Sequence, residues 1–216
     1  MKKFLQNLAI VAAVMLSFAT NAQVSTFPYT CGFEDASENA EWTLTNGSET
    51  CKWYIGTAAN NGGSNGLYIS SDNGTSNTYV STASKVMAYR QLSLTAGTVY
   101  SLSFDWRCNG ESTYDIARVF LVPASTSLSA GTSYKLSAPT GDVINEPKFN
   151  LNSSWTQWSK EGIVVPTTGN YKLVFYWEND GSVNNDPPVA IDNIVFSAPT
   201  CPVPLNLAVS NITSSS

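Results

Sequence analysis

Two acidic residues stand in apolar surroundings, one near each end of the chain. Asp192 is embedded in Pro188–Phe196, a strand-length segment that is apolar on both faces apart from Asp192 and Asn193. Glu34 directly follows the large apolar residue Phe33. A carboxylate in such surroundings costs free energy unless it is paired, hydrogen-bonded or bound to a cation. We therefore expect the first and last strands to lie side by side, with Glu34 and Asp192 sharing one cation.

Calcium is the cation that suits these residue types, because it binds about six to eight oxygen atoms from carboxylates, carbonyls and water. Glu34, Asp192 and Asp35 would supply the negative charge, and Asp72 or the carbonyl groups of residues 70–74 would complete the shell. The alternative interpretation is that these acids cap turns or face solvent.

A second group of polar and aromatic side chains surrounds the expected connection at residues 108–113. Sugar recognition requires aromatic faces and fixed polar groups in a concave site. We expect a binding surface across the strand pair that flanks this connection, formed by Asp105, Arg107, Glu111, Tyr114 and Arg118. A salt-bridged sheet face without any ligand is the alternative.

The residues that many secreted hydrolases use are missing or wrongly spaced. The chain has no histidine, which removes the usual general base for a Ser or Cys nucleophile. A glycosidase needs two carboxylates at a defined separation, and the candidate pairs are Glu111 with Asp115 and Glu178 with Asp180. Neither pair shows the Glu-x-Asp-x-x-Glu pattern of a jelly-roll glucanase, so we expect no catalytic activity.

Residues 1–22 have the features of a secretory signal peptide. Lys2 and Lys3 precede the apolar run Leu8–Phe18, which is too short for a comfortable membrane span. We expect the mature chain to begin at Gln23, to be secreted to the extracellular space or cell surface, and not to insert into a membrane. A retained anchor is the alternative, although nothing basic follows the apolar run.

The chain is acidic, and its net charge of −5 becomes −7 when the two signal-peptide lysines are removed. Such a chain repels phosphate backbones, so no nucleic-acid partner is expected. Divalent cations and neutral ligands remain compatible with this charge.

The four cysteines suggest two disulfides in an oxidising compartment, with three possible pairings. If the first and last strands are neighbours, the natural pairs are Cys31 with Cys201 and Cys51 with Cys108. Free buried thiols are the alternative. No Cys-x-x-Cys spacing indicates a redox or zinc role.

Short alternating or apolar segments between Gly, Asn, Ser and Pro clusters predict an all-β protein, a two-sheet antiparallel β-sandwich. Ser37–Trp42 is expected to form one helical turn with Ser37 as its cap. Alternation places Tyr100, Leu102, Phe104 and Trp106 in the core. The expected strands include one around Phe33 and the segments Trp53–Ile55, Gly66–Ser70, Val86–Leu94, Val99–Cys108, Asp115–Val122, Gln157–Val164, Asn170–Trp177 and Val189–Phe196. Residues 124–152 form a weakly patterned connection with room for one irregular strand.

Several short motifs, in this order, resemble a known module. They are Phe33-Glu-Asp35, Trp42, Lys52-Trp-Tyr-Ile-Gly56, Leu67-Tyr-Ile-Ser70, Leu102-Ser-Phe-Asp-Trp106, Gly110-Glu111 with Tyr114-Asp115, and Ile191-Asp-Asn-Ile194. The pattern is similar to the MAM-like, cleaved-adhesin (choice-of-anchor J type) modules of Bacteroidetes secreted surface proteins. The resemblance covers about Tyr29 to Phe196. It implies a jelly roll with structural calcium, with Glu34 and Asp192 as typical ligands.

The sequence is interpreted as three parts: a signal peptide at 1–22, the jelly-roll domain at 23–198, and residues 199–216. The last part is a Pro-rich linker followed by what resembles the truncated start of a fibronectin type III domain. We expect a non-catalytic adhesion or carbohydrate-binding module whose partners are glycans, host or matrix proteins, and further domains of a parent protein. A structural spacer is the first alternative, and a secreted glycoside hydrolase is a less favoured one.

Overall fold

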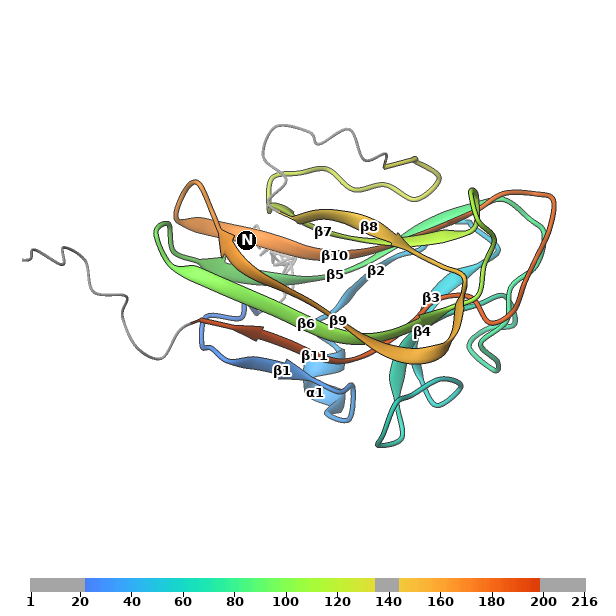
Figure 1. The fold of residues 1–216 in the computed structure, drawn as a ribbon, viewed down its shortest axis with the longest axis horizontal. Helices are drawn as coiled ribbons and strands as arrows, with labels where there is room; N and C mark the ends of the chain where they lie inside the picture. The colour runs from blue at the N-terminus through green and yellow to red at the C-terminus, as the bar shows by residue number, and fades with distance from the viewer. Residues whose placement is uncertain (1–21, 135–143, 199–216) are drawn as a thin grey trace, which may run out of the picture.

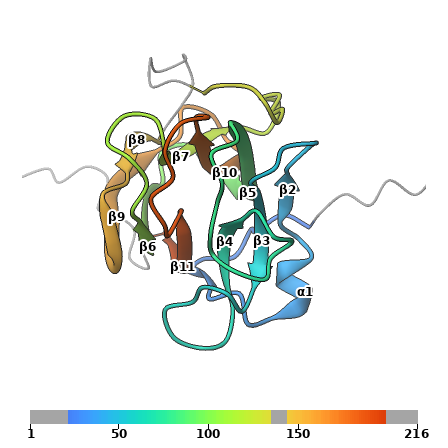
Figure 2. The same cartoon turned by 90° about the vertical axis from the view of Figure 1, so that its right-hand side faces the viewer.

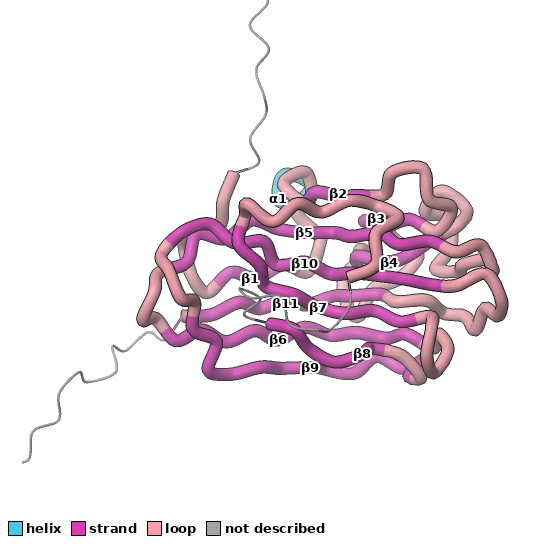
Figure 3. Tube along the Cα trace, turned by 90° about the horizontal axis from the view of Figure 1, so that it is seen from above, coloured by secondary structure: helices cyan, strands magenta, loops and turns pink. Residues whose placement is uncertain are grey.

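Two antiparallel sheets pack face to face in the computed structural model, which describes residues 22–134 and 144–198 (Figure 1). Seen end-on, the strands form two layers, with the short helix α1 (Ala36–Asn39) beside β2 (Thr43–Thr45) and β3 (Lys52–Gly56) at one edge (Figure 2). The strands of both layers run along the long axis of the domain (Figure 3). The predicted all-β, two-sheet antiparallel sandwich is thus confirmed.

The six-stranded sheet follows the order β3-β4-β11-β6-β9, with β1 also paired to β11. The five-stranded sheet follows the order β2-β5-β10-β7-β8. The strands of the first sheet are β1 (Tyr29–Cys31), β3 (Lys52–Gly56), β4 (Gly66–Ser70), β6 (Val99–Cys108), β9 (Asn152–Val164) and β11 (Ala190–Ser197). Those of the second are β2 (Thr43–Thr45), β5 (Ser84–Leu94), β7 (Ile116–Pro123), β8 (Ile144–Phe149) and β10 (Gly169–Asn179).

From β4 to β11 the chain crosses between the sheets at every connection except the one from β7 to β8. The order β4-β11-β6-β9 therefore faces β5-β10-β7-β8, which is the arrangement of a double-sheet jelly roll. One consequence matters for the site: β6 and β7, consecutive in sequence, belong to different sheets.

The closing strand β11 lies inside its sheet and confirms the predicted neighbourhood of the first and last strands. One side of β11 pairs with β6. Its other side pairs with β4 through Ala190 and Ile191, and with β1 through Ile194 to Phe196. Strands β4 and β1 thus lie end to end along β11, and residues 192 and 193 fall at the point where they meet.

The alternating strands bury the faces that the sequence predicts. Tyr100, Leu102 and Phe104 of β6 are each at most 3% exposed, whereas Trp106, the fourth predicted core residue, is only partly buried against the core. Phe104 packs edge-on against Phe175 of β10 at 5.0 Å between ring centroids, which joins the two sheets. Each large apolar side chain buried in this way contributes about 1.5–3 kcal/mol to folding. The aromatic residues of these strands are therefore core rather than ligand platform.

Local details differ from the sequence-based expectations at the start of the domain. The cap of α1 is Asp35, whose carboxylate accepts the Ser37 N–H, so the predicted Ser37 cap is wrong. Phe33 is not in a strand: β1 ends at Cys31, and Phe33 adopts a φ of 59°. This left-handed turn directs the chain out of the sheet. β2 was not predicted, and β8 occupies the weakly patterned connection.

Cys51 and Cys108 are free and buried, and Cys31 is buried without a disulfide partner among the described residues. The predicted Cys51–Cys108 disulfide is therefore wrong, and the predicted alternative of free thiols holds for these two. Strands β4 and β11 separate β3, which follows Cys51, from β6, which ends on Cys108. Three strand spacings of about 4.8 Å place these backbones roughly 14 Å apart, beyond the ~7 Å limit of a disulfide.

Some predictions fall on segments beyond the described residues. They include the signal peptide up to residue 21, Cys201 with its pairing to Cys31, and the fibronectin-like start at residues 199–216. Within residues 22–134 and 144–198, no helix has the length and apolar character needed to cross a membrane.

We predict that Cys51 and Cys108 both react as thiols when the protein is denatured without reductant, because the sheet order keeps them apart. Iodoacetamide labelling followed by non-reducing peptide mapping measures this, with a reduced sample as the control for complete labelling. A cross-linked peptide containing both cysteines would contradict the sheet order described above.

Candidate functional site

A cluster of three carboxylates, Glu34, Asp105 and Asp192, gathers on the outer face of the six-stranded sheet. Asp192 projects from β11 on the same side as Ala190 and is fully buried. Its Oδ2 accepts the Asn61 N–H at 2.6 Å, and its Oδ1 accepts the N–H of Asn193 at 2.7 Å. The carboxylate is buried because the loop at residues 57–65 covers this part of the sheet.

Asp105 of β6 joins the cluster, although the sequence interpretation assigned it to the ligand surface. Its Oδ2 accepts the side-chain amides of Asn61 and Asn193, each at 2.9 Å. Asn193 also donates to the carbonyl of Asn61 at 2.8 Å. Two asparagines therefore link the loop to β6 and β11.

Glu34 is exposed and is held by the same loop. Its Oε1 accepts the backbone N–H groups of Ser64 and Asn65, both at 2.8 Å. Gly63, at φ +71°, makes this approach possible, because a Cβ there would lie 2.4 Å from Oε1 of Glu34. The sequence interpretation missed this loop because its main donors are backbone N–H groups. The pair Gly62-Gly63 was the one feature of the sequence that indicated a tight backbone approach there.

The electrostatics of the cluster follow from burial and N–H donors. Burial raises the pKa of Asp192 above its ordinary value, and the carboxylates of Asp105 and Glu34 raise it further, while the Asn61 and Asn193 N–H groups oppose the shift. The N–H groups of Asn65 and Ser64 lower the pKa of Glu34. The predicted proximity of Glu34 and Asp192 is therefore supported.

The other two predicted calcium ligands have separate roles. Asp35 caps α1, and the Ser37 donors lower its pKa. Asp72 accepts Ser70 Oγ–H at 2.5 Å and Ser76 N–H at 2.9 Å within its own loop. These and the Ser76 hydroxyl lower the pKa of Asp72 to about 2. Both acids accept hydrogen bonds from nearby residues of their own turns, as the alternative interpretation expected.

Hard oxygen ligands suited to calcium are present in the cluster, but they do not form a ready-made cage. In the part of the chain that the structure describes, no group of three or more Asp, Glu, Cys or His side chains is placed to hold a metal. Amide N–H groups provide part of the compensation that the sequence interpretation attributed to a cation. Calcium binding here stays a prediction.

The five residues predicted to form one ligand surface are divided between the two sheets. Asp105 and Arg107 lie on β6 in the six-stranded sheet, whereas Arg118 lies on β7 in the five-stranded sheet. Tyr114 and Glu111 belong to the connection that crosses between the sheets. Because β6 and β7 are not neighbours in one sheet, these residues do not form a single surface.

Arg107 is integrated into the outer face of the six-stranded sheet. Its Nη2 donates to Asn77 Oδ1 at 3.0 Å, and its guanidinium lies 5.2 Å from the centre of the Trp155 ring. Burial lowers its pKa. Its Nε is buried without an acceptor among the described residues, but Asn77 and Trp155 hold the rest of the guanidinium.

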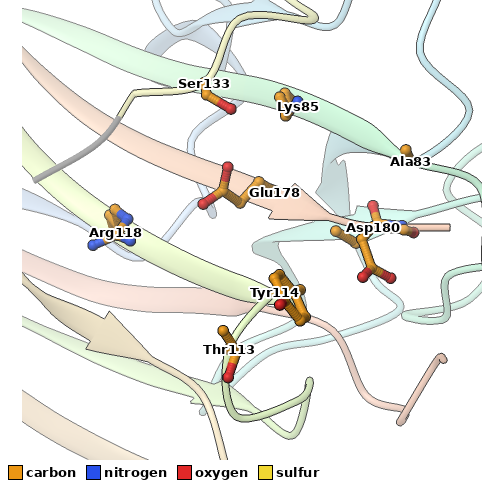
Figure 4. A pocket seen from close by; sticks show the side chains of 9 residues that line it. Ala83, Lys85, Thr113, Tyr114, Arg118, Ser133, Glu178 and Asp180 are labelled. Carbon is orange, nitrogen blue, oxygen red and sulfur yellow. The ribbon is translucent and has the colours of Figure 1, made fainter. Parts of the chain in front are cut away.

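An open pocket of about 430 Å³ lies on the outer face of the five-stranded sheet. Three adjacent strands line it, through Lys85 of β5, Glu178 of β10 and Arg118 of β7 (Figure 4). Tyr114, which is 56% exposed, and Asp180 lie on the loops beside them. Two of the five predicted ligand residues, Tyr114 and Arg118, thus belong to this pocket.

Strand register brings the charged side chains of the pocket together. Glu178 is directly opposite Lys85 on β5, while Arg118 is opposite Tyr176 and so diagonal to Glu178. Diagonal neighbours on one sheet face are about 7–8 Å apart, within reach of long side chains. Tyr176 donates its hydroxyl to Glu178 Oε2 at 2.8 Å.

The buried carboxylate of Asp115 holds the two loops that border the pocket. It accepts the Tyr79 hydroxyl at 2.6 Å and the Asp180 N–H at 3.0 Å. Burial raises its pKa, and these donors oppose the shift. Desolvation raises the pKa of Glu111, and the nearby charges of Asp115 and Asp180 raise it further.

One sequence motif typical of a serine nucleophile occurs away from the pocket. Gly62-Gly-Ser-Asn-Gly66 has the form Gly-x-Ser-x-Gly, but Ser64 lies in the 57–65 loop rather than in a strand-to-helix turn. With no histidine in the chain, this serine lacks the usual base.

Comparison with known proteins gives structural neighbours only. No family model and no curated protein matches this chain. Among solved structures, the K1 cleaved adhesin domain of Lys-gingipain from Porphyromonas gingivalis W83 is 15% identical, with a TM-score of 0.45. The match covers 81% of this chain and 99% of that one.

Carbohydrate-binding modules are also among the neighbours. A xylan-binding domain of family 22 is 16% identical, with coverages of 81% and 96% and a TM-score of 0.47. A family 61 module in complex with β-1,4-galactotriose is 14% identical, with coverages of 73% and 88% and a TM-score of 0.42. At these identities and TM-scores the neighbours carry no argument about the function of this chain.

Replacing Gly63 by alanine is predicted to lower the free energy of unfolding by about 1–3 kcal/mol. The new Cβ forces Glu34 away from the Ser64 and Asn65 N–H groups and adds left-handed strain. Gly97→Ala is the matched control, because Gly97 has φ +81° and a Cβ added there would meet nothing within 4 Å. Equal destabilisation of both variants in urea denaturation would show that the Glu34 contact contributes nothing.

Removing calcium with a chelator is predicted to lower the melting temperature, because a cation bound at the cluster stabilises the folded state by mass action. Thermal melts with millimolar calcium and with excess chelator measure this. In Asp192→Asn the difference between the two melts should largely disappear. Superimposable wild-type curves would contradict a calcium site.

Proposed function

We propose that residues 23–198 form a non-catalytic carbohydrate-binding module that acts outside the cell. The observation that carries the proposal is the open pocket on the five-stranded sheet, in which an exposed tyrosine lies beside several polar side chains. Its volume of about 430 Å³ falls in the range of small-ligand sites. Aromatic faces together with fixed polar groups suit a sugar ring, which is apolar on its faces and polar at its edges.

The pocket favours binding over the alternative of a structural spacer, which requires no such feature. Tyr114 is the aromatic side chain in the pocket lining, and a folded domain gains nothing from leaving its exposed surface in water. An extracellular location is part of the proposal and rests on the signal-like segment at residues 1–22.

A hydrolase is the less favoured alternative at the same place. Glu178 and Asp180 both line the pocket, but each already accepts a hydrogen bond, from Tyr176 and from Ser182 respectively. These contacts suit fixed hydrogen-bond acceptors that orient a ligand. For every polysaccharide that the protein binds, an assay for newly formed reducing ends shows whether the polysaccharide is also hydrolysed.

Glycan-array screening followed by affinity electrophoresis is predicted to identify at least one soluble saccharide that the protein binds without cleaving. Tyr114→Ala should weaken this binding roughly tenfold through loss of ring contact, with no change in melting temperature. Val99→Ala is the control, since Val99 is 38% exposed but lies at the start of β6. If no saccharide binds, the proposal is wrong.

A further inference from the structure

Arg118 is buried without the partners that a buried guanidinium normally has. It is 6% exposed, and its Nε and Nη1 atoms are buried without a hydrogen-bond acceptor among the described residues. Burial lowers its pKa, and only the nearby Glu178 and Tyr176 oppose the shift. Because burying a charge without hydrogen bonds is costly, an acceptor supplied from outside the fold would stabilise it.

Arg90 shows what the same fold does with a buried arginine that has a structural role. Arg90 is 3% exposed, and its Nε and Nη2 donate to the two carboxylate oxygens of Glu38 at 2.7 and 3.1 Å. Arg118 has Glu178 as its diagonal neighbour, yet no ion pair forms between them within the described residues. The guanidinium of Arg118 is thus available to a ligand in the pocket.

Acceptors are also available across the pocket. Glu178 uses Oε2 to accept the Tyr176 hydroxyl, and Asp180 uses Oδ1 to accept both donors of Ser182. Among the described residues, nothing donates to the second carboxylate oxygen of either side chain. Arg118 on β7 therefore has unpaired donors, and Glu178 and Asp180 each have an unpaired acceptor. Figure 4 shows these three side chains around the pocket.

The charges of the pocket select against an anionic ligand. Lys85 and Arg118 contribute two positive charges, and Glu178 and Asp180 contribute two negative ones. Asp115 and Glu111 add further carboxylates close to Asp180. A carboxylate or sulfate group would gain contact with Arg118 but would be repelled by these acids.

We propose that the pocket binds a neutral saccharide through two adjacent hydroxyl groups, one accepting from Arg118 and the other donating to Glu178 or Asp180. This inference rests on the proposed carbohydrate-binding function. A hydroxyl both donates and accepts, so a vicinal pair matches the mixed set of groups that the pocket leaves unpaired. Arg118 is then the residue that holds the sugar hydroxyl, and the carboxylates of the pocket exclude acidic sugars.

The test compares Arg118→Met with Arg107→Met in affinity electrophoresis and calorimetry. The probes are neutral oligosaccharides of glucose, galactose and xylose, with oligogalacturonate as the acidic counterpart. Arg118→Met should lose neutral-saccharide affinity roughly tenfold or more, since a charge-assisted hydrogen bond is removed. Its melting temperature should stay the same or rise, because the fold gives two of its nitrogens no acceptor. Arg107→Met should keep the affinity, since Arg107 lies on the other sheet.

Periodate provides an independent readout, because it cleaves the carbon–carbon bond of vicinal diols. Neutral polysaccharide treated with periodate and then borohydride should no longer bind, while mock-treated polysaccharide should. Unchanged affinity in Arg118→Met overturns the inference but leaves the carbohydrate-binding function standing. Preference for oligogalacturonate overturns the neutral class. If the wild type binds none of the saccharides, the proposed function and this inference both fail.

Discussion

The buried carboxylate of Asp192 constrains one whole side of the six-stranded sheet. β4 and β1 meet end to end along β11, so regular pairing on that edge is interrupted at residues 192 and 193. On the other edge the register with β6 shifts between Asp192 and Val195, and Asn193 adopts φ 49°. The interruption needs donors from elsewhere, and the 57–65 loop supplies them. The same loop donates its Ser64 and Asn65 N–H groups to Glu34, which brings Gly63 against that carboxylate.

The two outer faces of the sandwich treat their charged groups differently. On the six-stranded sheet, Asp105 and Asp192 each accept two hydrogen bonds from neutral N–H groups, so the loop and the sheet hold each other. On the five-stranded sheet, Arg118 is buried with two nitrogens that have no acceptor in the described chain. An unsatisfied buried group requires an explanation, because folding alone gains nothing from it. On the six-stranded sheet the Nε of Arg107 also lacks an acceptor, but its Nη2 donates to Asn77. For Arg118, we propose that a ligand supplies the acceptor.

Much of the fold follows from the sequence because alternation is a local property. The inward residues of β6 and β10 were predictable from side-chain type alone, and so was the apolar character of β11. Backbone donors leave no such pattern, which is why the loop that holds Glu34 and Asp192 was missed. Sheet membership is not local either: the crossing connection from β6 to β7 separates Arg107 from Arg118, and strand order separates Cys51 from Cys108. Arg107 and Arg118 are close in sequence and alike in chemistry, yet they lie on different surfaces.

The pocket is rigid on one side because of a carboxylate that no ligand would reach. Asp115 is fully buried and bonds to Tyr79 and to the backbone of Asp180, while the Tyr79 hydroxyl in turn accepts the Asn185 N–H at 2.8 Å. One buried acid thus fixes the loop that carries Tyr114 relative to the loop that follows β10. A site whose walls are already positioned loses little conformational entropy when a flexible saccharide binds. Tyr114 and Asp180 accordingly belong to one preorganised surface, separate from the carboxylate cluster on the opposite sheet.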